Sequence, residues 1–129
     1  MCSILERIII PSRVKVIQSE AFADCSSLKE VFLPLILTKI GDRAFSGCFS
    51  LKNIAIPSSV REIGEYAFAD CHSLTSINIS LGVRVLGDSV FGGCTSLTHI
   101  DIPKSVYEIG SDAFYGCENL RTVYVSAST

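Results

Sequence analysis

The sequence predicts a solenoid of stacked coils, built from a 23-residue unit that recurs without insertion or deletion. Cysteine marks the unit, a leucine follows it three residues later, and an aromatic-containing turn closes it. The cysteines are Cys2, Cys25, Cys48, Cys71, Cys94 and Cys117. Five full units run from Cys2 to Gly116 and a partial sixth covers 117–129, so we expect a single repeat domain over 1–129 that is part of a longer chain.

The first half of each unit alternates apolar and variable residues, which predicts a β-strand. Successive side chains of a strand face opposite sides. We therefore expect Ile54 and Ile56 to point inward, and Asn53 and Ala55 to point outward. A proline such as Pro57 follows in most units and ends the strand, because proline has no N–H to donate to a neighbouring strand.

The second half reads Val-x-x-Ile-Gly and predicts a shorter extended segment that ends in a tight turn. Polar residues then stand where a helical turn would need an N-cap: Ser19, Asp42, Asp88 and Ser111. An Ala-Phe pair follows in most units, and we expect its phenylalanine to fill the interior. One unit cannot bury its apolar residues alone, but stacked units can, because each residue lands on its copy in the next coil.

The pattern Cys-x-x-Leu-x-x-Ile-x-Ile-Pro-x-x-Val-x-x-Ile-Gly-x-x-Ala-Phe resembles the BspA-like class of leucine-rich repeats over essentially the whole chain. The resemblance implies a leucine-rich-repeat solenoid, a right-handed superhelix with a parallel β-sheet on the concave face and short extended or helical turns on the convex face. It also implies a role in adhesion as part of a surface antigen, with no catalytic residue and no cofactor.

The chain departs from this class because neither end shows a polar capping segment. The first strand, expected over 7–10, and the last, over 122–125, would leave apolar ladders and strand edges bare. We therefore expect self-association through the uncapped ends, or coverage of the ends by further parts of the parent protein.

The cysteines recur at one packing position, which predicts a ladder of six buried and reduced thiols. Neighbouring cysteines would lie close, but their parallel side chains would separate the Cβ atoms beyond the ~3.8 Å of a disulfide. A zinc site is disfavoured because no Cys-x-x-Cys pair exists.

Charge and hydropathy exclude several kinds of partner. The 11 Lys and Arg residues are balanced by 13 Asp and Glu residues without a cluster of one sign, which disfavours nucleic acid. No apolar run reaches the roughly 20 residues of a membrane span. His72 and His99 have no catalytic companion in the sequence, so we expect no enzyme and no metal site.

The outward positions of the strands form two columns that the core does not dictate, and we expect a protein partner to bind there. One column runs Arg7, Glu30, Asn53, Ser76, His99, Thr122, and the other runs Ile9, Phe32, Ala55, Asn78, Asp101, Tyr124. Phe32 and Tyr124 are the expected anchors, because aromatic residues dominate binding hot spots. Ile9 beside Phe32 would form an apolar patch that Leu35 and Ile36 extend.

The expected function is therefore a protein–protein interaction or adhesion module, whose ligand could be a host matrix protein or another cell-surface protein. The alternative is a structural spacer in a larger protein, with Ile9 and Phe32 covered by upstream repeats. Apolar outward residues favour binding, because a spacer has no need of them. The compartment stays open: the resemblance favours a cell surface, whereas unpaired thiols favour a reducing cytosol.

Overall fold

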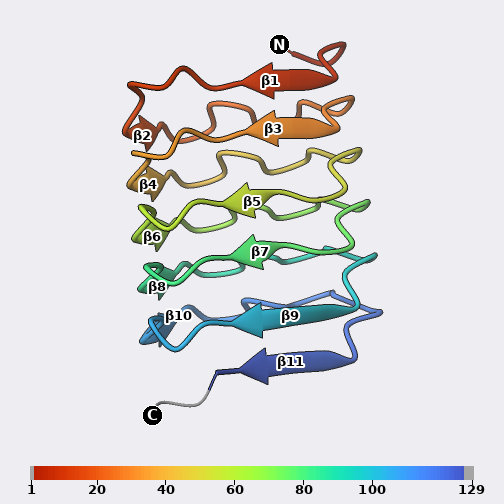
Figure 1. The fold of residues 1–129 in the computed structure, drawn as a ribbon. Coiled ribbons are helices and arrows are strands. Elements are labelled where there is room, and N and C mark those ends of the chain that lie inside the picture. The colour runs from red at the N-terminus through yellow and green to blue at the C-terminus, as the bar shows by residue number, and fades with distance from the viewer. Residues whose placement is uncertain (1, 127–129) are drawn as a thin grey trace.

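The computed structural model describes residues 2–126, which form a parallel β-solenoid. Each coil has one strand of two to four residues on its first side, and in the first five coils a two-residue strand follows on the second side before turns lead to the next coil (Figure 1). The first-side strands are β1 (Arg7–Ile9), β3 (Glu30–Phe32), β5 (Ala55–Ile56), β7 (Asn78–Ile79), β9 (His99–Ile102) and β11 (Thr122–Val125). The second-side strands are β2 (Val16–Ile17), β4 (Lys39–Ile40), β6 (Glu62–Ile63), β8 (Val85–Leu86) and β10 (Glu108–Ile109).

The strands stack in the register that the sequence predicts. Residues 23 apart are partners on both sides, as in Ile8 with Val31 on the first side and Ile40 with Ile63 on the second. The second-side strands form one five-stranded parallel sheet. The first-side strands are also parallel, but their hydrogen bonding is divided into the pairs β1–β3, β5–β7 and β9–β11.

Columns of identical or similar apolar residues fill the interior. Phe45, Phe68 and Phe91 are fully buried, and neighbouring rings stack with centroids 5.5 Å and 6.0 Å apart. Ile54 and Ile56 point inward while Ala55 between them is exposed, as the alternation predicts. Among the described residues, no polar or charged residue is buried. The core is therefore a set of apolar ladders that run along the solenoid.

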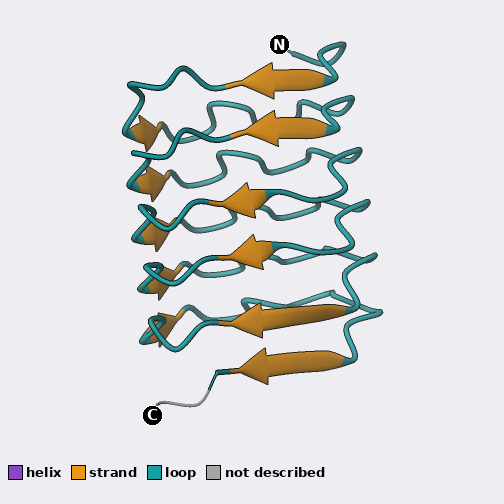
Figure 2. Cartoon of the chain, viewed as in Figure 1, coloured by secondary structure: helices purple, strands orange, loops and turns teal. Residues whose placement is uncertain are grey.

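The third side of each coil differs from the expected helical turn. Residues 2–126 contain no helix, and the segments after the second-side strands are hydrogen-bonded turns (Figure 2). Asp42 and Asp88 do not cap their own turn. Their Oδ1 atoms instead accept hydrogen bonds from the backbone N–H groups of Glu65, at 2.9 Å, and Ser111, at 2.8 Å. These carboxylates therefore join neighbouring coils rather than begin a helix.

The glycines after the second-side strands allow the coils to approach closely. A Cβ added to Gly64 would lie 2.7 Å from the Asp42 nitrogen and 2.9 Å from the Gly41 carbonyl carbon. Real Cβ atoms essentially never come so close to backbone atoms. Gly64 does not have a positive φ, so its role is close backbone packing rather than an unusual turn conformation.

Four cysteines form the expected ladder of reduced thiols. Cys48, Cys71 and Cys94 are buried, and Cys117 is half-buried. Each Sγ donates a hydrogen bond to the backbone oxygen of the phenylalanine in the preceding coil, for example from Cys71 to Phe45 at 3.3 Å. Burial raises the pKa of all four thiols. These side chains are therefore protonated packing groups rather than nucleophiles.

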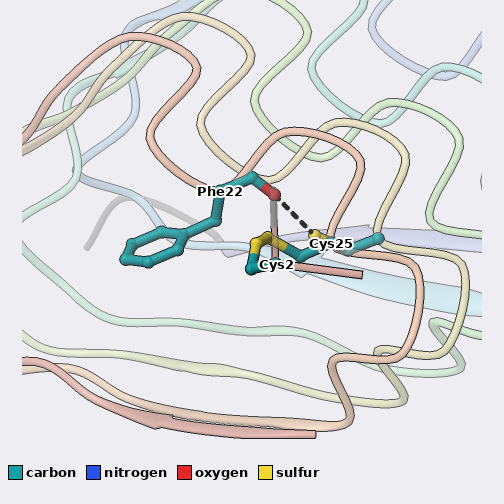
Figure 3. The surroundings of a disulfide bond; sticks show 4 residues. Cys2, Phe22 and Cys25 are labelled. Carbon is teal, nitrogen blue, oxygen red and sulfur yellow. Dashed lines mark hydrogen bonds between the residues drawn. A yellow bond between two sulfur atoms is a disulfide. The ribbon is translucent and has the colours of Figure 1, made fainter. Parts of the chain in front are cut away.

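The prediction of six reduced, buried thiols is wrong for the first pair. Cys2 and Cys25 form a disulfide, with their Cα atoms 5.0 Å apart, and Cys2 is only half-buried (Figure 3). The prediction assumed that every sulfur is held alike. The four free thiols are directed to a phenylalanine carbonyl, such as that of Phe22, which accepts from Cys48. Cys2 and Cys25 are instead bonded to each other, so the first two sulfurs of the ladder form a covalent link between neighbouring coils.

Thiol counting tests this arrangement. After denaturation without reductant, we expect four reactive thiols, and six after reduction. In the native protein only Cys117 should react, and slowly, because it is the one free thiol that is not buried. The Cys117→Ala variant should abolish the native reaction. Six thiols without reductant, or a native reaction that persists in Cys117→Ala, would contradict the arrangement.

The buried thiols also predict a loss of stability in alkaline solution. Burial raises the pKa of Cys48 and Cys94 from 9.0 to about 12. The folded protein therefore holds these protons more tightly than the unfolded chain. Their contribution to the free energy of unfolding is complete below pH 9.0 and is lost as the pH rises toward about 12. The loss should be about 1.4 kcal/mol per pH unit for each thiol.

Urea unfolding between pH 8 and pH 11 measures this loss. Tyrosine and lysine residues also titrate in this range, so the informative quantity is the difference in slope between the parent chain and a Cys48→Ala/Cys94→Ala variant. The variant should show the shallower slope. Equal slopes would show that these thiols do not titrate with unfolding.

Candidate partner-binding face

Nine of the ten predicted partner-binding residues lie in the first-side strands β1, β3, β7, β9 and β11, and Asn53 lies two residues before β5. We call the outward side of these strands and of β5 the strand face, and Figure 1 shows the strands stacked along one side of the solenoid. Strand register places Ile9 beside Phe32 and Tyr124 beside Asp101. Nine of the ten predicted contact residues are exposed, and Thr122 is half-buried. The exposed nine are Arg7, Ile9, Glu30, Phe32, Asn53, Asn78, His99, Asp101 and Tyr124.

The amino-terminal part of the strand face is apolar. Ile9 is 68% exposed and Phe32 is 43% exposed. The guanidinium of Arg7 lies 5.0 Å from the centre of the Phe32 ring, which fixes that ring from one side. Leu35, 85% exposed, and Ile36 follow β3. The apolar patch that the sequence predicts is therefore exposed.

A groove of about 310 Å³ lies beside this patch. Phe32 and Leu35 line it from one coil, Ala55 and Pro57 from the next, and Asn78 from the coil after that. The groove exists because Ala55 is small where the preceding coil has Phe32 at the same position. Two polar side chains, Asn78 and Ser80, stand at its far side. The patch thus combines an apolar surface with a depression that could hold a partner's side chain.

The carboxyl-terminal part of the strand face is polar around one aromatic residue. β9 and β11 place His99 beside Thr122, and Asp101 beside Tyr124. The Thr98 hydroxyl lies 3.2 Å from Nδ1 of His99, so a neighbouring side chain orients this imidazole. Tyr124 is 57% exposed. The two expected anchors, Phe32 and Tyr124, are thus on one face but in different coils, with Asn53 and Asn78 between them.

The titratable groups of the described residues gather neither on the strand face nor around a metal site. Within residues 2–126, no three His, Cys, Asp or Glu side chains gather in a way that could hold a metal ion. The clear pKa shifts fall on the four reduced cysteines of the interior, away from the strand face. In the described part of the chain, no helix is long and apolar enough to cross a membrane.

Sequence reasoning missed a second exposed groove, on the turns of the third side. Tyr66 and Tyr115 flank it, and Gly92 and Gly93 form its floor. The available signal was Gly92, at a position where the next unit has Tyr115 and the earlier units have small side chains.

Comparisons with known proteins agree with this architecture. Residues 1–121 match the family model of the BspA type leucine rich repeat region in six copies. A leucine-rich repeat protein of Treponema pallidum is 38% identical, with a TM-score of 0.88, and the match covers 91% of this chain and 57% of that one. The chain thus spans little more than half the length of that protein. No curated protein matches the sequence.

Two further solved structures are similar. A leucine-rich repeat protein from Bacteroides ovatus is 34% identical over 95% of this chain and 38% of its own length, with a TM-score of 0.73. The pneumococcal vaccine antigen PcpA is 30% identical over 93% of this chain and 29% of its own length, with a TM-score of 0.80. The repeated unit, the stacked coils and the six matched copies agree, and the chain belongs to the BspA-type leucine-rich repeat family.

Proposed function

We propose that this chain is a protein-binding module that docks a protein partner on its strand face, as part of an adhesive surface antigen. The observation that carries the proposal is the apolar patch of Ile9, Phe32, Leu35 and Ile36, which is exposed to solvent. Monomeric proteins rarely leave large contiguous apolar surface exposed unless it is used for binding. The likeness to the pneumococcal vaccine antigen PcpA supports the antigen part of the proposal.

The rigidity of the strand face supports the same proposal. Its residues are fixed by strand pairing and by side chains anchored in apolar ladders, as Val31 anchors the strand that carries Phe32. A partner that docks there orders little additional backbone, which lowers the entropic cost of binding. Arg7 over the Phe32 ring adds a charged group at the edge of the patch. Such a centre of apolar residues with a polar rim is the usual anatomy of a protein interface.

The alternative is a spacer, in which the repeats only extend a longer protein. A spacer needs the interior ladders but has no need of Phe32 or Tyr124 at exposed positions. The two proposals predict different results for alanine substitution, because a spacer would lose no binding affinity when Phe32 or Tyr124 is replaced.

The test is the binding of Phe32→Ala and Tyr124→Ala to purified extracellular matrix proteins immobilised on a biosensor. Each substitution should weaken binding by about 1–2 kcal/mol if the residue is an anchor. Tyr107→Ala is the matched control, because Tyr107 is 75% exposed but lies outside the strand face. Circular dichroism checks that each variant is folded. Absence of binding by the parent chain, or equal binding by all three variants, would favour the spacer.

A further inference from the structure

The second groove lies on the turns of the third side and has a volume of about 220 Å³. It arises from one coil that carries small residues between two coils that carry tyrosines. Ser89 stands 23 positions after Tyr66, and Gly92 stands 23 positions before Tyr115. The two tyrosines therefore bound a notch that is two coils wide, about 10 Å at the usual strand spacing.

The walls of the notch present aromatic surface and one carboxylate. Tyr115 is 75% exposed and Tyr66 is 38% exposed. The Asp70 carboxylate also lines the groove, with its side chain 61% exposed and its Oδ1 4.0 Å from Nε2 of His72. No lysine or arginine lines the groove. The notch is therefore lined by one acidic side chain and by two aromatic rings, whose faces carry negative electrostatic potential.

The floor of the notch offers few donors to an anion. The backbone N–H of Gly93 donates to the carbonyl of Tyr115, and that of Gly92 donates to the carbonyl of Ser89. The Asp70 N–H is likewise used, by the carbonyl of Gly92. The side-chain polar groups that line the notch are the carboxylate of Asp70 and the hydroxyls of Ser89, Tyr66 and Tyr115.

One of these tyrosines already binds a cation within the molecule. The guanidinium of Arg43, from the preceding coil, lies 4.6 Å from the centre of the Tyr66 ring. Arg43, Tyr66 and Ser89 are equivalent residues of three successive coils, and Ser89 has no charged group to place over the other face of the Tyr66 ring. The notch thus opens at the point where the column of charged and aromatic side chains is interrupted.

We propose that this notch binds an organic cation whose charge is surrounded by alkyl or planar surface, an alkylammonium or a guanidinium group. The ring of Tyr115 and the open side of Tyr66 would contact the cation, and Asp70 would neutralise it. The group could be a free small molecule or the end of a lysine or arginine side chain. The proposal concerns a different surface from the strand face and does not depend on the function proposed for that face.

Binding of four small probes to the whole chain tests this assignment, with the tyrosine ring resonances followed by NMR. Choline represents a free alkylammonium, and N-acetylarginine amide represents a side-chain cation. The probe 3,3-dimethylbutan-1-ol has the shape of choline without its charge, and glucose represents a sugar. Both cations should bind at least about fivefold more tightly than either neutral probe, the factor that corresponds to about 1 kcal/mol. The tighter of the two cations identifies the source of the ligand.

Variants locate the site. Asp70→Asn removes the charge but keeps the shape, and asparagine accepts the left-handed backbone at this position, where φ is 58°. Tyr115→Ala removes one wall, and each substitution should weaken cation binding about fivefold. Gly92→Ala should also weaken cation binding, because the new methyl group would fill the floor of the notch. The equivalent residue of the preceding coil, Ala69, is already an alanine. Tyr107→Ala, equally exposed, should change nothing.

The proposal is overturned if choline and its neutral analogue bind equally, if neither cation binds, or if folded Asp70→Asn and Tyr115→Ala variants bind as the parent chain does. Tighter binding of glucose than of either cation would also overturn it and would assign the notch to a sugar.

Discussion

The close approach of backbone to backbone between neighbouring coils is the constraint on which the rest of the structure depends. Hydrogen bonds link each coil to the next through the five-stranded second-side sheet and through the third-side turns, as in Phe45 N–H to the carbonyl of Ala67 at 2.8 Å, and they also join the first-side strands in the pairs β1–β3, β5–β7 and β9–β11. Residues that stack on each other in neighbouring coils, such as Ile40 and Ile63, are separated by the length of the unit. An inserted residue would move every later side chain out of its ladder, because the same interval serves all three sides.

This constraint explains which residues are allowed at each position. At Gly64 a side chain would collide with the backbone of the preceding coil. At Phe68 the stacking of coils brings the ring onto that of Phe45, with ring centroids 5.5 Å apart. The coil-packing constraint does not apply to outward positions, because a side chain that points to solvent meets no backbone of a neighbouring coil. They can therefore differ from coil to coil, and the apolar patch around Phe32 and the notch below Tyr66 both arise from such differences.

Periodicity within the sequence was enough to predict the ladders and the exposed columns. The alternation around Ile54 and Ile56 predicts which side chains face inward. The 23-residue spacing of the cysteines predicts which residues become neighbours in adjacent coils. The features that were missed depend on contacts between coils that no single unit encodes. Asp42 was expected to cap a helix, but its acceptor is used by Glu65 of the next coil.

The cysteines and the notch show the same limit. Cys25 has the same place in its unit as Cys48, yet Cys25 is bonded to Cys2 whereas the Cys48 thiol donates to the carbonyl of Phe22, a difference that the shared repeat position does not encode. The notch requires two tyrosines from different coils and a small residue between them, so its parts are 23 or more residues apart in the sequence. The partner-binding residues on the strand face could be placed, but the chemistry of their partner is not encoded in the repeat.

The most direct measurement of the coil-packing constraint compares the free energies of unfolding of Gly64→Ala and Gly92→Ala. Neither glycine has a positive φ, so both substitutions are equivalent in backbone conformation. At Gly64 the new Cβ would meet backbone atoms at 2.7 Å and 2.9 Å, whereas at Gly92 its nearest neighbour would be 3.3 Å away. We predict that Gly64→Ala destabilises the protein by about 1–3 kcal/mol and that Gly92→Ala has a much smaller effect. Equal free energies of unfolding for the two variants would contradict the claim that backbone approach between coils governs this structure.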